Sequence, residues 1–184
     1  MDTLEIPDAQ PEQPPRQPTR QHPRRQGREF ALQVLYQVDL TGTEPHQALA
    51  LFWQNFEPGT KGREFTTDLV EGSWRERERL DTLIADAAEN WRLGRLPKVD
   101  VNLLRLSTYE LLTYPDLSAG VTINEAIEIA RRYCSDEAPT FINGVLDRIA
   151  TVVGKKTEKQ AEKKTQQIEQ VKKAQHHEPT ESSD

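Results

Sequence analysis

Apolar residues in the middle of the chain recur at intervals of three and four, which is the spacing of a helix that buries one face. The stretch from Glu29 to Leu40 shows this pattern, because its apolar positions fall at i, i+1, i+4, i+5 and i+8. Similar patterns predict further helices over residues 48–56, 65–70, 80–91, 99–112, 122–134 and 139–153. No segment alternates strictly between apolar and polar positions, as a half-buried strand would. The sequence therefore predicts an all-α fold, a helical bundle of six or seven helices.

Residues that favour helix ends bound several of these segments. Gly42 and Gly154 follow the first and last stripes, where glycine is typical of a helix C-terminus. Thr122 and Glu125 have the spacing of a capping box, in which both side chains satisfy backbone N–H groups at a helix start. We therefore expect a helix to begin at Thr122, with Glu125 serving its cap.

Two glycines fall within the apolar stretches. Gly72 lies between two stripes and predicts a break between helices. Gly144 lies inside the last stripe, where glycine costs about 1 kcal/mol relative to alanine. Close approach of a neighbouring helix would explain that cost, and this is the interpretation that we favour.

The formal net charge of the 184 residues is −6, but the two signs of charge are separated along the chain. Residues 29–153 hold 12 basic and 20 acidic residues, whereas the arginines of the N-terminal arm lie between its acidic residues and this core. The first 28 residues include six prolines and no aromatic residue before the core begins, and the end of the chain is rich in Lys, Glu and Gln. Such segments bury too little apolar surface to offset the entropy of ordering. We expect disorder up to Arg28 and divide the chain into an arm (1–23), a helical domain (24–153) and a charged tail (154–184).

The residues that catalysis or metal binding would need are scattered. The four histidines, at positions 22, 46, 176 and 177, share no helix face with Cys134 or with a second histidine. Zinc needs about four converging ligands, and Cys134 lies on an apolar stripe, as a small buried side chain does. No Gly-rich phosphate loop is present. We therefore expect no active site, no metal and no cofactor.

The sequence also bears on the compartment. It contains no run of about 18 apolar residues, so it predicts no membrane span, and its N-terminus lacks the apolar segment of a secretory signal. The single cysteine cannot form an internal disulfide, which fits a reducing compartment such as the cytoplasm.

The arginines at the start of the domain carry the strongest signal for nucleic acid. Arg24, Arg25 and Arg28 precede a helix that presents Gln33 and Tyr36 away from its apolar stripe or at its edge. Guanidinium groups match phosphate, whereas amides and aromatic rings bind or stack on unpaired bases. The pattern fits single-stranded RNA, and a solvated basic linker explains it about as well.

Four blocks of the sequence make the interpretation more specific. They are RRQGREFALQVLY at 24–36, LRLSTYEL at 104–111, VTINEAIEIA at 121–130 and FINGVLD at 141–147. In this order they resemble the NusB family of bacterial transcription antitermination factors, over about two thirds of the chain.

The resemblance implies an all-helical fold of two packed three-helix subdomains and a role without catalysis. NusB proteins pair with NusE, a small-subunit ribosomal protein, and together bind the boxA element of nascent RNA. The complex joins elongating RNA polymerase and supports antitermination and ribosomal RNA transcription. Whether this chain is a monomer or a homodimer stays open.

The resemblance also assigns candidate residues position by position. The RNA-facing positions are Arg24, Arg25, Arg28, Gln33, Tyr36, Glu137 and Phe141, and the NusE-facing positions are Asp100 and Arg105. Some have structural alternatives, since Tyr36 also suits a helix edge, Phe141 a core and Asp100 the first turn of a helix. Gln26 and Gly27 depart from some family members, and Gly27 predicts weaker continuation of the helix into the arm.

Two other functions fit parts of this pattern. NusB-like domains also begin certain RNA cytosine methyltransferases, but the chain has neither the length nor the strands for the catalytic domain that such an enzyme needs. A helical protein–protein adaptor without RNA contact is the remaining alternative, and RNA crosslinking to residues 24–36 would separate it from an RNA-binding factor.

Overall fold

The computed structural model describes residues 23–56, 60–88 and 93–155, which contain seven α-helices, one short 3₁₀ helix (η1, Leu93–Arg95) and no strand. The all-α prediction is therefore confirmed. The predicted disorder of residues 1–22 and 156–184 lies outside the described residues. The α-helices are α1 (Pro23–Thr41), α2 (Pro45–Asn55), α3 (Thr60–Arg75), α4 (Arg77–Ala87), α5 (Lys98–Thr113), α6 (Ala119–Tyr133) and α7 (Ala138–Val152).

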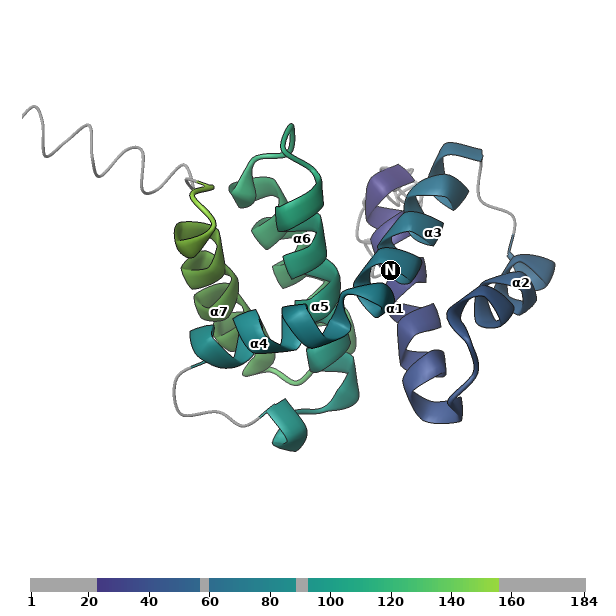
Figure 1. The fold of residues 1–184 in the computed structure, drawn as a ribbon, viewed down its shortest axis with the longest axis horizontal. Helices are drawn as coiled ribbons and strands as arrows, with labels where there is room; N and C mark the ends of the chain where they lie inside the picture. The colour runs from purple at the N-terminus through teal and green to yellow at the C-terminus, as the bar shows by residue number, and fades with distance from the viewer. Residues whose placement is uncertain (1–22, 57–59, 89–92, 156–184) are drawn as a thin grey trace, which may run out of the picture.

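The helices form two groups that meet along α5 (Figure 1). Helices α1, α2 and α3 pack on one another, and α4, α5, α6 and α7 form the second group, which has four helices where the family resemblance implied three. Helix α5 contacts α1 and α3 as well as α4, α6 and α7. Eleven of its sixteen residues are buried, so α5 is the central element of the fold.

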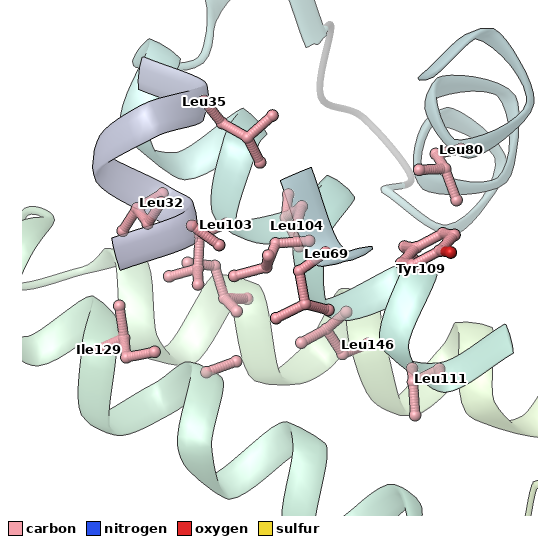
Figure 2. Close-up of a cluster of buried hydrophobic side chains, with 14 of the residues drawn as sticks. Leu32, Leu35, Leu69, Leu80, Leu103, Leu104, Tyr109, Leu111, Ile129 and Leu146 are labelled. Atoms are coloured by element: carbon pink, nitrogen blue, oxygen red, sulfur yellow. The ribbon is translucent and has the colours of Figure 1, made fainter. Parts of the chain in front are cut away.

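One apolar core runs through both groups. Figure 2 shows leucine and isoleucine side chains from several helices gathered around this centre. Each such side chain contributes about 1.5–3 kcal/mol when it leaves water completely. Its fully buried members include Leu35 from α1, Leu69 from α3, Leu103 and Leu104 from α5, Ile129 from α6 and Leu146 from α7.

Close helix approach occurs at different glycines from the one expected. A Cβ atom at Gly72, inside α3, would lie 2.0 Å from Cζ of the buried Tyr109 on α5. A Cβ atom at Gly27, inside α1, would lie 2.8 Å from Cδ1 of Phe65 on α3. Helix α1 continues through Gly27 as far as Pro23, and the predicted break at Gly72, inside α3, is wrong. So is the predicted close approach at Gly144, which is exposed and has no neighbour within 4 Å of that position.

Helix α6 begins earlier than the capping-box pattern predicts. Its N-cap is Ser118, whose hydroxyl oxygen accepts a hydrogen bond from the backbone N–H of Val121 at 3.4 Å. Thr122 is buried within the first turns, and Glu125 binds arginines of α1 instead of the helix end. The predicted capping box is therefore wrong, because a serine four residues upstream supplies the cap. The predicted glycine ends are confirmed, since Gly42 and Gly154 have φ values of 69° and 74°.

The glycine contacts predict opposite effects of the same substitution at two helical positions. Gly72→Ala is expected to lower the free energy of unfolding by about 1–3 kcal/mol, because the new methyl group must displace the enclosed Tyr109 ring. Gly144→Ala, the matched control, is expected to raise it by up to about 1 kcal/mol through helix propensity. Urea unfolding of both variants measures the difference, and equal effects would contradict the packing described at Gly72.

Candidate nucleic-acid interface

Helix α1 is joined to the second helix group by ion pairs that start in its first turn. Arg25 binds Glu125 of α6 through two hydrogen bonds, from Nε to Oε2 at 2.9 Å and from Nη2 to Oε1 at 2.7 Å. Arg28 donates to both carboxylate oxygens of Glu110 on α5, with Nε 2.8 Å from Oε2. Residues 23–28 are therefore helical, and their predicted disorder is wrong, because carboxylates 82 and 100 residues further along the chain bind two of the arginines.

Arg28 is enclosed by the protein. Its side chain is 4% exposed and that of Glu110 is 1% exposed, and Glu125 adds a second carboxylate 3.6 Å from Nη1. Taking both charges out of water costs several kcal/mol per ion, which the two-point hydrogen bonding offsets. The predicted exposure of Arg28 to RNA is therefore wrong: the side chain ties α1 to α5.

Arg24 and Arg25 stay at the surface. The side chain of Arg25 is 36% exposed, and its hydrogen bond with Glu125 raises the pKa of the guanidinium, which stays charged. Arg24 is exposed, and its guanidinium carbon lies 5.7 Å from the centre of the Phe65 ring, within the range of a cation–π contact. Positive charge is therefore presented at the N-terminus of α1.

The outer face of α1 carries the other predicted contacts. Gln33 is exposed and Tyr36 is 41% exposed, so their predicted position outside the apolar stripe is confirmed. Glu29 precedes them at helical spacing and accepts a hydrogen bond at 2.6 Å from Nη1 of Arg132, at the end of α6. An amide, a phenol ring and a guanidinium thus lie along the same side of α1.

Arg105, predicted to face a partner, is bound within the chain. Its Nε and Nη2 atoms donate to the two oxygens of Asp81 on α4, both at 2.7 Å, and its Nη1 lies 3.3 Å from Oδ2 of Asp39 on α1. Burial lowers the pKa of Arg105, but the hydrogen bonds and charge of Asp81 outweigh it and raise the pKa. Arg105 therefore links α5 to α1 and α4.

A cavity of about 660 Å³ lies where η1 and the start of α5 meet the segment between α6 and α7. Asp100, Glu137 and Phe141 line it, together with Arg95 and Leu96 among others. The side chain of Asp100 is largely buried and accepts a hydrogen bond from the thiol of Cys134, while its Oδ1 atom is enclosed without a hydrogen-bond partner among the described residues. The family resemblance implied a protein-facing position for Asp100 and RNA-facing positions for Glu137 and Phe141, and the structure brings the three around one cavity.

Cys134 follows α6 beside this cavity. Its burial and the neighbouring Asp100 raise the pKa of the thiol to about 12, so the thiol stays protonated at neutral pH. Because the thiolate is the nucleophilic form, this environment suits the predicted small apolar side chain. Cys134 packs against the hydrophobic core and is half-buried rather than fully buried.

The described residues were also searched for a metal site and for a membrane-spanning helix. Within residues 23–56, 60–88 and 93–155, no group of three His, Cys, Asp or Glu side chains is arranged to hold a metal ion. Over the same ranges, no helix has both the length and the apolar character needed to cross a membrane.

Sequence patterns missed the carboxylates and the arginine that organise this region. Glu110, Glu125 and Arg132 fall on ordinary helical stretches, and their partners on α1 lie 82 to 103 residues away. The available signal was indirect, since acidic residues on otherwise apolar stripes require a buried partner. A single sequence does not say which basic residue that partner is.

Known sequences are similar to this chain over the region that contains these helices. A sequence model of the NusB family matches residues 25–151. The chain is 46% identical over 130 residues to the transcription antitermination protein NusB of Geobacter sulfurreducens, covering 70% of this chain and 94% of that protein. It is 45% identical over 140 residues to the NusB of Desulfatibacillum aliphaticivorans, covering 76% of this chain and 96% of that protein.

Solved structures agree with these sequence relationships. A T. maritima NusB structure is similar with a TM-score of 0.65 at 38% identity, covering 71% of this chain and 92% of that one. A crystal structure of antitermination factors NusB and NusE in complex with dsRNA is similar with a TM-score of 0.64 at 27% identity, covering 71% of this chain and 97% of that one. With the family pattern matched from α1 to α7, the chain belongs to the NusB family.

Proposed function

We propose that this chain is a transcription antitermination factor that binds boxA-type RNA together with NusE and joins elongating RNA polymerase, supporting ribosomal RNA transcription. It works in the cytoplasm by binding rather than by catalysis. The observation that carries the proposal is the outer face of α1, where exposed Gln33 and Tyr36 follow the surface arginines Arg24 and Arg25 on the same helix. Its relatives are named as antitermination proteins, and one similar structure holds NusB with NusE and dsRNA.

The face of α1 suits RNA because it combines two kinds of contact. Arg24 and Arg25 supply charge for phosphates at the start of the helix, which gives affinity that weakens with salt. Gln33 and Tyr36, two to three turns further along, offer an amide for hydrogen bonds and a ring for base stacking. Phosphate contacts would position the strand, and the amide and ring would discriminate between bases.

The cavity suits a basic partner side chain. Asp100, Asp136 and Glu137 are three acidic residues of its lining. Phe141 offers an aromatic ring on the same wall, against which a guanidinium can stack. We assign this cavity to NusE rather than to RNA, since its three acidic lining residues outnumber the basic Arg95 and would repel phosphate.

The RNA face predicts a strong effect of removing one ring. Tyr36→Ala is expected to weaken RNA binding by about 5- to 150-fold, because stacking contributes about 1–3 kcal/mol per base. Tyr36→Phe keeps the ring and is expected to bind nearly as the parent does. Fluorescence anisotropy with labelled boxA RNA, single-stranded and duplex, with and without NusE, measures both variants. Equal affinity of Tyr36→Ala and the parent protein for both RNA forms would remove Tyr36 from the interface.

The cavity predicts an effect on NusE binding that is separate from any effect on RNA binding. Asp100→Asn is expected to weaken NusE binding by about 30-fold or more, because it leaves a basic partner side chain unpaired at a desolvated site. RNA binding by the chain alone is expected to stay unchanged. Asp116→Asn removes the same charge at an exposed position between α5 and α6 and serves as the control in calorimetric titrations with NusE. Loss of NusE binding in both variants to the same extent would mean that net charge, and not this cavity, attracts the partner.

A protein–protein adaptor without RNA contact is the alternative that these measurements separate. Such an adaptor would bind NusE with the Asp100 dependence given above and would leave RNA affinity the same as that of NusE alone. The RNA-binding factor proposed here adds affinity to the NusE complex, because each partner contributes its own contacts.

A further inference from the structure

We propose that Arg132, at the C-terminus of α6, is an additional phosphate contact for RNA lying along α1. This inference rests on the proposed RNA-binding function of the α1 face. It adds α6 to the RNA-binding surface, because Arg132 lies outside the sequence blocks at 24–36 and 141–147.

Arg132 is held against α1 by a nearly buried anchor. Its Nη1 donates to Oε1 of Glu29 at 2.6 Å, and the side chain of Glu29 is 8% exposed while that of Arg132 is 50% exposed. The carboxylate therefore lies beneath the guanidinium, which keeps an open side towards solvent. An arginine presents five N–H donors in a planar fork, so donors remain for a second acceptor.

The anchor places Arg132 next to the face that carries the proposed base contacts. Arg25 pairs with Glu125, and four residues later Glu29 pairs with Arg132, so the two pairs follow one another in the same direction along α1 and α6. Gln33 is one turn beyond Glu29 on α1, and Tyr36 follows three residues later. A strand that stacks on Tyr36 and passes Gln33 therefore reaches the guanidinium of Arg132 next.

Arg131, the neighbouring arginine, serves as a matched comparison for Arg132. Arg131 is 64% exposed and pairs with Glu128 on its own helix, one turn earlier. Consecutive residues of an α-helix point about 100° apart, so Arg131 is directed away from the direction in which Arg132 reaches α1. Both residues complement the C-terminal end of the α6 dipole equally well. A purely structural role at the helix end therefore predicts similar behaviour of the two, whereas phosphate contact predicts different behaviour.

The test is a salt titration of RNA binding by the full chain. Arg132→Gln is expected to weaken binding of labelled single-stranded boxA RNA about 5-fold at low salt. It should also reduce the slope of log affinity against log salt concentration by about 0.7, the value for one lost phosphate contact on a single strand. Arg132→Lys keeps the charge and is expected to keep the slope, and Arg131→Gln is expected to leave affinity and slope unchanged.

A double variant guards against loss of folding, because Arg132→Gln alone leaves the carboxylate of Glu29 unpaired. Glu29→Gln with Arg132→Gln removes both charges and is expected to show the same reduced slope with parent-like thermal unfolding. An unchanged slope in the double variant, or an equal reduction in Arg131→Gln, overturns the proposal for Arg132. Failure of the parent chain to bind RNA at all, with or without NusE, would instead overturn the proposed function on which it rests.

Discussion

The position of α1 depends on the buried ion pair between Arg28 and Glu110. The pair crosses from the first helix group to α5, against which α1, α3, α4, α6 and α7 pack. Because both charges are almost wholly removed from water, each requires the other, and separation of the two helices would leave an unpaired charge in a medium that solvates it poorly. Glu125 lies close enough to join the pair and also binds Arg25, so the same set of charges fixes α1 to α6.

This constraint connects the two proposed binding regions. Helix α5 carries Asp100 in its first turn, at the cavity, and Glu110 ten residues later, at the ion pair. At 1.5 Å per residue these positions are about 15 Å apart on one rigid helix. The outer face of α1 and the acidic cavity are therefore held at a fixed separation, as the proposed simultaneous binding of RNA and a basic protein partner requires.

The helices themselves follow from local patterns, and their exact ends and contacts do not. Apolar spacing located all seven α-helices, and glycine at a helix end located the terminations at Gly42 and Gly154. The sequence predicts a break at Gly72 because it does not reveal that Tyr109, 37 residues later, occupies the space of its missing side chain. The capping-box pattern misplaces the start of α6 because Ser118 supplies the cap and Glu125 binds Arg25 of α1.

In the candidate site, too, some properties follow from local sequence patterns and others depend on contacts between helices. Gln33 and Tyr36 could be placed at the surface from helical periodicity alone, since exposure on one helix is a local property. The burial of Arg28 could not, because it depends on a carboxylate on another helix. The convergence of Asp100, Glu137 and Phe141 on one cavity and the anchoring of Arg132 by Glu29 are likewise properties of the packed helices.

The most direct test of the role of the buried pair is a double-mutant cycle on the free energy of unfolding with Arg28→Met, Glu110→Leu and both together. Each single change should cost about 3–5 kcal/mol, and the double variant should cost clearly less than their sum. Costs that add to within about 0.5 kcal/mol would contradict the claim that this pair holds α1 in place.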